Sequence, residues 1–228
     1  AESLLRSRLE VAPSDARASQ MLIGLLVNDK NYVTAEAEAR RLLAVTDETA
    51  IADYLLGSVL QIQGKSKSAM EYFTKALEQA PESAEALQGY AAALADTQGQ
   101  PATVRYLKAH VKKYPDQLHA SSLLSQVQAG SGDTLGAEQT LQAALEKNEA
   151  WLPAYTGLAS MQAGDISKQI EIFEEGMQAA GDIVYEPTHE VVQVHGHVLV
   201  GEDVLAEPEE VGAGEFAVEV EDPLGALK

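Results

Sequence analysis

Small and apolar residues recur every three or four positions between residues 50 and 80, the spacing of one face of an amphipathic helix. One stripe contains Leu56, Gly57 and Leu60, and a second contains Ala69, Phe73, Ala76 and Leu77. Gly64 separates the stripes and Pro81 follows the second, as expected for a turn and a helix end. The pattern predicts two antiparallel helices. The small residues allow the helices to approach closely, and the large residues fill the space between them.

The same pattern returns with a fixed period. Pro81 and Pro115 lie 34 positions apart, and Pro13 lies two periods before Pro81. The position of Leu56 returns as Leu22, Tyr90, Leu124 and Leu158, that of Ala69 as Ala1, Ala35, Thr103 and Ala137, and that of Phe73 as Leu5, Ala39, Leu107 and Leu141. Larger residues replace small ones at Arg8, Ile23, Leu42 and His110, where we expect looser packing. Such a period indicates helical repeats that stack on one another.

Residues 50–83 resemble one unit of the tetratricopeptide-repeat family, whose spacing these residues follow. The resemblance implies an all-α fold over residues 1–181, a right-handed superhelical solenoid of antiparallel helix pairs. We expect a lone helix at residues 1–13 and pairs at about 16–46, 50–80, 84–114, 118–147 and 152–179, a half repeat plus five pairs. Pro101 and Pro153 fall in first turns, where proline is tolerated. Because the sequence begins inside a repeat, we expect a fragment of a longer array.

The helical pattern ends after Gly181. Residues 182–228 hold twelve acidic residues and one basic residue, and the stretches 188–200 and 215–221 alternate between apolar and polar positions as strands do. We predict a separate, non-helical acidic segment of unknown role. It is a disordered tail, a hairpin, or sequence foreign to the repeat protein.

Charge and composition limit the partners. The 228 residues carry a formal net charge of −19, which argues against nucleic acid because phosphate binding requires a basic surface. No apolar run approaches the roughly 20 residues that cross a bilayer, so we expect no direct membrane insertion. There is no cysteine and no glycine-rich phosphate loop, so we expect no cofactor and no enzymatic site in the repeats. Bacterial periplasm and cytoplasm both remain open as locations.

The resemblance also implies where a partner binds, because the first helices of such repeats line a concave groove. In this sequence the predicted partner-binding residues are Arg17, Gln20, Asn28, Tyr54, Ser58, Gln61, Gln88, Asp96, His119, Ser122, Gln126, Thr156 and Ser160, with Gly24, Val27, Ile62, Glu85 and Ala92 beside them. The set is mostly neutral and polar, with Tyr54 as its main aromatic side chain. It suits a protein or an extended peptide, or a polysaccharide. The basic clamp with which some family members hold the carboxylate of chaperones is not matched.

These features predict a protein-interaction scaffold, by analogy in a bacterial envelope, secretion or polysaccharide-export assembly. The alternative is part of an enzyme or metal-binding protein whose active portion is the C-terminal segment or lies outside this fragment. There, His189, His195 and His197 would share a strand face, followed by Glu202. In the repeats, His110 falls at a helix seam and is expected to be packed. Trp151 either anchors an interface or packs over a helix start.

Overall fold

The computed structural model describes residues 1–181, 192–194 and 197–199. Eleven α-helices lie in the first of these ranges: α1 (Glu2–Val11), α2 (Ala16–Asn28), α3 (Tyr32–Val45), α4 (Thr49–Ile62), α5 (Ser66–Gln79), α6 (Ala84–Gln98), α7 (Gln100–Lys113), α8 (Leu118–Gly130), α9 (Thr134–Leu145), α10 (Leu152–Met161) and α11 (Ile166–Ala180). These bounds confirm the predicted lone helix and the five pairs.

The chain divides into two compact units, Ala1–Val184 and Tyr185–Lys228. In the second unit, β1 (Val192–Val194) pairs antiparallel with β2 (His197–Leu199), inside the predicted alternating stretch 188–200. The other alternating stretch, 215–221, lies outside the described residues. In the first unit, α11 ends at Gly181, whose left-handed φ of 70° is one that glycine adopts readily. A domain boundary after residue 181 remains a prediction.

Local sequence signals account for the helix ends. Asp15, Asn31 and Ser83 each accept a hydrogen bond from a backbone amide in the first turn of the following helix. Pro101 and Pro153 lie in first turns, as predicted. Gly64 turns the chain between α4 and α5 with a φ of 74°. At the equivalent turn one period earlier, Lys30 has a φ of 58°, a conformation that costs an ordinary residue about 1–2 kcal/mol.

The seam between α4 and α5 confirms the role of small residues. Ala69 is completely buried, and Phe73 fills the space between the two helices. A Cβ atom added at Gly57 would lie 2.9 Å from the Phe73 ring, so the approach of the helices depends on glycine there. Leu56 and Leu60 are buried on the same seam, whereas Leu77 is only half-buried.

The larger residues at small-residue positions differ in how far they are buried. Ile23 and Leu42 are buried in the first core, and His110 is also buried, as expected for a packed seam histidine. Arg8 is exposed and pairs with Asp15 at 2.8 Å. Among the described residues, one cluster of buried apolar residues extends from α1 to α5 and reaches Ala93 in α6, and another extends from α6 to α8. Further buried apolar residues, such as Leu141 and Tyr155, lie in α9 and α10. The core is therefore interrupted near the third pair.

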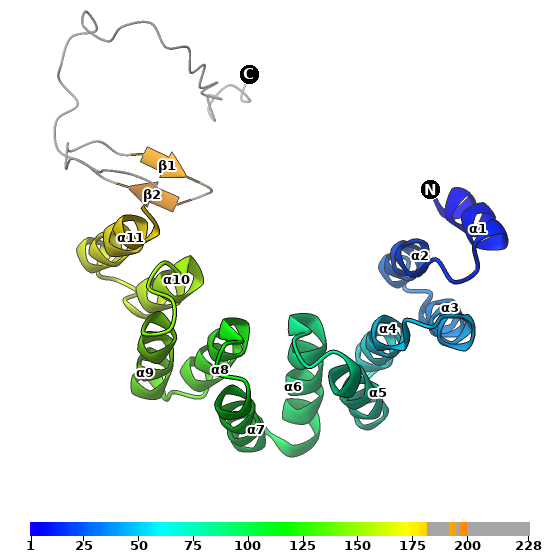
Figure 1. Ribbon diagram of the computed structural model, residues 1–228, viewed down its shortest axis with the longest axis horizontal. Coiled ribbons are helices and arrows are strands. Elements are labelled where there is room, and N and C mark those ends of the chain that lie inside the picture. Colours follow the sequence, from blue (N-terminus) through cyan, green and yellow to red (C-terminus); the bar gives the residue numbers. More distant parts are fainter. Residues whose placement is uncertain (182–191, 195–196, 200–228) are drawn as a thin grey trace, which may run out of the picture. The chain divides into compact units, whose positions relative to one another are not determined.

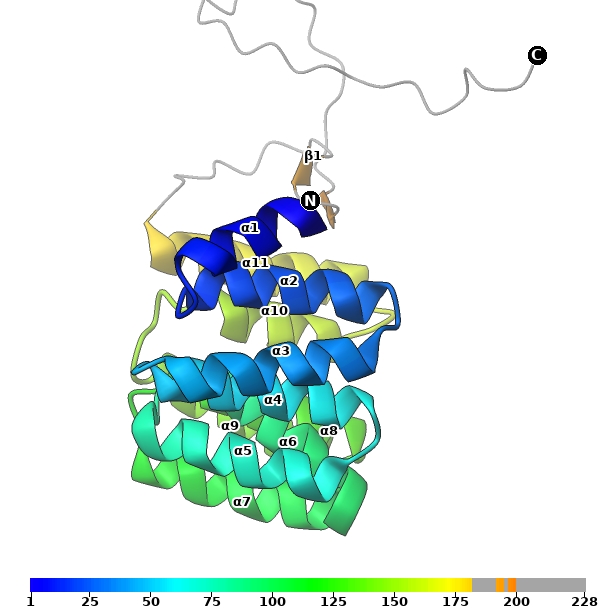
Figure 2. The ribbon, with the colours of Figure 1, turned by 90° about the vertical axis from the view of Figure 1, so that its right-hand side faces the viewer.

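Within the helical unit, each helix packs against the next one along the chain, and the first helices of successive pairs also contact one another. The described helices form a right-handed superhelical solenoid of antiparallel pairs, as predicted. Figure 1 shows α2, α4, α6, α8 and α10 on the inner side of this curved row, with α3, α5, α7 and α9 on the outer side. Figure 2 shows the outer helices α3, α5 and α7 running side by side.

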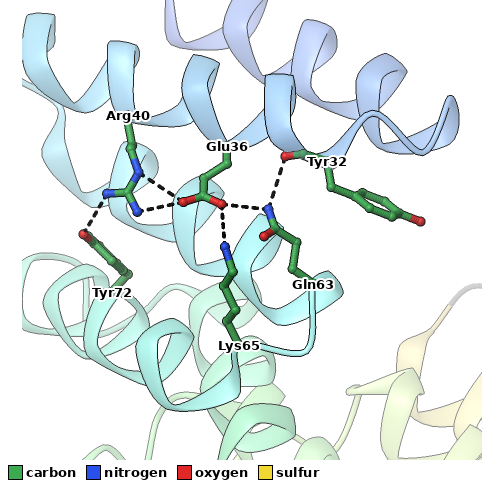
Figure 3. A network of polar contacts seen from close by, with 6 residues as sticks. All are labelled: Tyr32, Glu36, Arg40, Gln63, Lys65 and Tyr72. Atoms are coloured by element: carbon green, nitrogen blue, oxygen red, sulfur yellow. Dashed lines mark hydrogen bonds and ion pairs between the residues drawn. The ribbon is translucent and has the colours of Figure 1, made fainter.

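A polar network joins the first pair to the second on the outer side (Figure 3). Arg40 Nη2 lies 2.8 Å from Glu36 Oε1, and Lys65 Nζ lies 2.9 Å from Glu36 Oε2. Gln63 Nε2 donates both to Glu36 Oε2 and to the carbonyl oxygen of Tyr32. Hydrogen bonds from Arg40, Lys65 and Gln63 lower the pKa of Glu36 from 4.5 to about 2. The carboxylate thus links α3 to the turn between α4 and α5.

Candidate partner-binding groove

The inner side of the helical unit presents one repeated position on each first helix. Gln20, Tyr54, Gln88, Ser122 and Thr156 are spaced by one period and lie on α2, α4, α6, α8 and α10. Because these five helices contact one another in order, equivalent positions follow each other along the inner side (Figure 1). We call this surface the inner groove.

Every predicted groove residue has some solvent exposure. The exposed ones are Arg17, Gln20, Asn28, Gln88, Asp96, Gln126, Thr156 and Ser160, and the half-buried ones are Tyr54, Ser58, Gln61, His119 and Ser122. With histidine counted as neutral, only two of these side chains are charged. They are Arg17, at one end of the set, and Asp96, near its middle. The structure therefore brings the predicted residues to one accessible and nearly neutral surface.

Three hydroxyl groups of this surface bond to their own helices. Ser58 donates to the carbonyl oxygen of Tyr54 at 2.9 Å, Thr156 to that of Leu152 at 3.2 Å and Ser160 to that of Gly157 at 2.7 Å. Each hydroxyl proton is thereby used, while the oxygen lone pairs remain able to accept. These serine and threonine side chains present acceptors to the groove.

Gln61 connects two first helices. Its Nε2 donates to Asp96 Oδ2 at 2.5 Å, and Ser66 Oγ donates to the same oxygen at 3.0 Å, so that α4, α5 and α6 meet at one carboxylate. The other end of the amide, Gln61 Oε1, is buried and has no hydrogen-bond partner among the described residues. A buried acceptor without a partner is uncommon, because leaving it unpaired costs free energy.

His119 is the second such residue. Its Nε2 is also buried without a hydrogen-bond partner among the described residues. Burial lowers its pKa below the ordinary value, the nearby His110 lowers it further, and Glu85 partly opposes the shift. The ring is therefore neutral at neutral pH, with one nitrogen that donates and one that accepts. Both unpaired buried side-chain atoms of the described residues, in Gln61 and His119, belong to the predicted groove set.

Tyr54 stands beside a cavity of about 340 Å³. Gln20 and Glu85 line it from the neighbouring first helices, and Ile51 supplies an apolar wall. The Tyr54 ring lies 6.3 Å from that of Phe73, centroid to centroid, which holds it against the core. The remaining lining residues, which the sequence analysis did not select, are Ala50, Ala76, Ala80 and Ser83. Ile51 could have been selected, because it lies one period from Arg17 and Glu85.

Metal sites and membrane spans are absent from the part of the chain that the structure describes. No group of three or more His, Cys, Asp or Glu residues among the described residues is arranged to hold a metal ion. His189, His195 and Glu202 of the predicted metal alternative lie outside the described residues, so that alternative remains a prediction. No helix within the described ranges has the length and apolar character needed to span a bilayer.

Antiparallel helix pairs stacked with a fixed period define a helical-repeat protein. Residues 54–83 match the model of the tetratricopeptide repeat family. This match identifies residues 54–83 as a tetratricopeptide repeat and supports the resemblance seen in the sequence. Proteins with this fold are generally protein-interaction scaffolds and generally not enzymes.

Several solved structures are similar to this chain at low sequence identity. Yeast Tom70 is 16% identical with a TM-score of 0.59, and the match covers 79% of this chain and 41% of Tom70. TTC0263, a thermophilic TPR protein of Thermus thermophilus, is 17% identical with a TM-score of 0.50 and coverages of 73% and 92%. YrrB, a TPR protein with an unusual peptide-binding site, is 20% identical with a TM-score of 0.46 and coverages of 80% and 95%. No curated protein sequence matches the chain.

Proposed function

We propose that this chain is a scaffold whose inner groove binds an extended peptide segment of a partner protein. The observation that carries the proposal is the row of equivalent polar side chains on five first helices. An extended peptide offers backbone amides and carbonyls at regular intervals, which match a row of side chains that donate and accept without net charge.

Tyr54 provides the apolar contact in this proposal. Its half-buried ring is fixed against Phe73 beside the 340 Å³ cavity, so that a partner side chain enters next to a rigid aromatic surface. Rigid aromatic side chains contribute contact area with little loss of conformational entropy. Peptide backbone would then pair with Gln88 on α6 and Gln126 on α8, whose side chains are exposed.

The test uses peptides selected from a random phage-displayed library on the full chain. We expect their affinity to fall roughly a hundredfold in the triple variant Tyr54→Ala, Gln88→Ala, Gln126→Ala, because each lost hydrogen bond costs about 0.5–1.5 kcal/mol and distant sites add. Isothermal titration calorimetry measures the affinity, and circular dichroism checks that the helices are retained.

The matched control removes the same side-chain types from second helices, as Tyr72→Ala, Gln139→Ala and Gln142→Ala. Tyr72 is half-buried like Tyr54, and Gln139 and Gln142 are exposed on α9. The control should bind the selected peptides as the wild type does. If the control loses binding and the groove variant keeps it, the binding face is the outer one. If no peptide is recovered and polysaccharide fragments bind, the ligand of the groove is a polysaccharide and not a peptide.

We also propose that the protein acts within a bacterial envelope, secretion or polysaccharide-export assembly. Co-purification of a partner with the full chain from its native cells, lost in the groove variant, tests this part separately. Recovery of a metal-loaded or enzymatically active chain instead would favour the alternative that places the chemistry in the C-terminal segment.

A further inference from the structure

Helix α7 is a basic element in an acidic chain. Its sequence contains Arg105, Lys108, Lys112 and Lys113 and no aspartate or glutamate, whereas the whole chain has a net charge of −19. All four side chains are exposed. Arg105, Lys108 and Lys112 recur at intervals of three and four, so they share one face of the helix. Helix α7 lies on the outer side of the helical unit (Figure 2), and these exposed side chains give it a basic stripe.

These cations are not neutralised within the described residues. Arg105 and Lys112 form no hydrogen bond or ion pair there, and the five ion pairs of the described part use Arg6, Arg8, Arg40, Arg41 and Lys65. Lys113 lies 4.9 Å above the centre of the Tyr114 ring, and Lys108 interacts with Asp133 only through the electrostatic field. The stripe is available to an anionic partner.

A cavity of about 440 Å³ adjoins the stripe. It lies between α5 and α7, and its lining includes Leu77 and Glu78 from α5, Tyr90 from α6, and Tyr106, His110 and Lys113 from α7. Figure 2 shows these two outer helices as neighbours. Lys113 belongs both to the cavity wall and to the basic helix, so the apolar and the charged surfaces are continuous. A volume of this size falls within the range of ligand sites.

Two residues that depart from the repeat pattern line this cavity. Tyr90 stands at the position of Leu56, and His110 at that of Ala76, one period later in each case. The larger His110 ring occupies the seam and bonds to Gln117 Oε1 at 3.0 Å. The core is divided into two clusters at this third pair. At these two positions the second pair has the apolar residues Leu56 and Ala76, whereas the third pair has polar aromatic rings.

The rings form a connected row. Tyr90 and Tyr106 have centroids 4.5 Å apart, Tyr106 and His110 6.1 Å, and His110 and Tyr114 4.8 Å. Burial raises the pKa of Tyr106 to about 12, with a further contribution from Tyr90 and Tyr114, so its hydroxyl stays protonated. The row therefore offers apolar ring faces and neutral hydroxyl donors, which suit an aromatic or apolar side chain with peptide carbonyls around it.

We propose that this outer site binds an acidic peptide segment of a partner protein, with one aromatic side chain in the tyrosine-lined cavity and its carboxylates on the basic stripe of α7. Charge complementarity selects this partner, since α7 concentrates unpaired positive charge while the rest of the chain repels anions. The site is independent of the inner groove and does not rest on the function proposed for it.

The probe is a fluorescein-labelled peptide of alternating Glu and Ser residues around one central Phe, titrated with the full chain and followed by fluorescence anisotropy. The triple variant Arg105→Glu, Lys112→Glu, Lys113→Glu should weaken binding by about tenfold or more. The matched control Lys67→Glu, Lys147→Glu, Lys168→Glu has the same net charge change on other exposed lysines and should change affinity by less than about twofold.

A second variant should raise the affinity for the probe. Glu78 is the carboxylate in the cavity wall, so Glu78→Gln should strengthen binding by roughly twofold to fivefold, a gain that an unfolded variant would not show. Replacing the central Phe of the probe by Ser should weaken binding, and so should raising salt from about 50 to about 300 mM. The groove variant Tyr54→Ala should bind the probe unchanged.

Three results would overturn the proposal. The first is no binding of the probe, or equal binding by wild type and α7 variant. The second is tighter binding of a single-stranded oligothymidine than of the peptide, which would make the stripe a phosphate-binding surface. The third is self-association of the chain that disappears in the α7 variant, which would make the occupant a second copy.

Discussion

Ala69 controls the distance between two helices. Its side chain is completely buried in the seam of α4 and α5, next to the buried Phe73. Ala35 and Ala137, which lie one period before and two periods after it, are also completely buried. These three pairs thus use the same small residue for the same contact, whereas the third pair has a larger one, Thr103.

Ala69→Leu should be destabilising by about 1–3 kcal/mol, because the seam has no room for three more carbon atoms. Urea unfolding followed by circular dichroism measures the change. Ala37→Leu, at an exposed position of α3, is the matched control and should stay within about 0.5 kcal/mol of wild type. An unchanged unfolding midpoint for Ala69→Leu would mean that the seam opens without cost.

At the scale of elements, the junction between the first two pairs depends on one carboxylate. Glu36 on α3 is bonded to Arg40 on the same helix and to Gln63 and Lys65 in the turn before α5 (Figure 3). Its side chain is only 18% exposed, so these bonds are partly shielded from solvent. Consecutive repeats are therefore joined by polar contacts on the outer side as well as by apolar packing.

Glu36→Gln tests this junction through pH. The folded pKa of Glu36, about 2, lies below the ordinary 4.5, so its stabilising effect is complete above pH 4.5 and is lost as pH falls toward 2. The urea midpoint of Glu36→Gln should therefore lie below that of wild type at neutral pH, and the difference should shrink on acidification. Glu71→Gln, on the exposed side of α5, is the matched control for the loss of one carboxylate. A difference independent of pH would contradict this role.

At the scale of the whole molecule, each helix of the unit packs mainly on its neighbours. A chain that stops at Gly181 should therefore keep its helical circular dichroism and its thermal unfolding midpoint, since α11 is already terminated by Gly181 in the left-handed conformation. Loss of helical signal, or a lower midpoint, would show that residues 182–228 stabilise the repeats and that the predicted boundary is wrong.

The periodicity of the sequence was sufficient to predict the helical fold. The recurrence of Leu56, Ala69 and Phe73 predicted every described helix of the unit, because amphipathic spacing, prolines and turn glycines act over a few residues. Lys30 in a left-handed turn was not foreseen, since its own sequence carries no signal for that conformation. Its position one period before Gly64 was the available clue.

For the candidate sites, the sequence alone determined which residues share the inner side, because register within a repeat decides the face of a helix. Only the tertiary structure determines which of these residues contact one another. Gln61 with Asp96, Gln20 with Tyr54, and the cavity between α5 and α7 all join residues from different helix pairs. Such contacts depend on how far neighbouring pairs rotate and separate. That arrangement depends on the volumes of side chains from different helices, such as Tyr90 and Tyr106 with ring centroids 4.5 Å apart, and not on the pattern of any one helix.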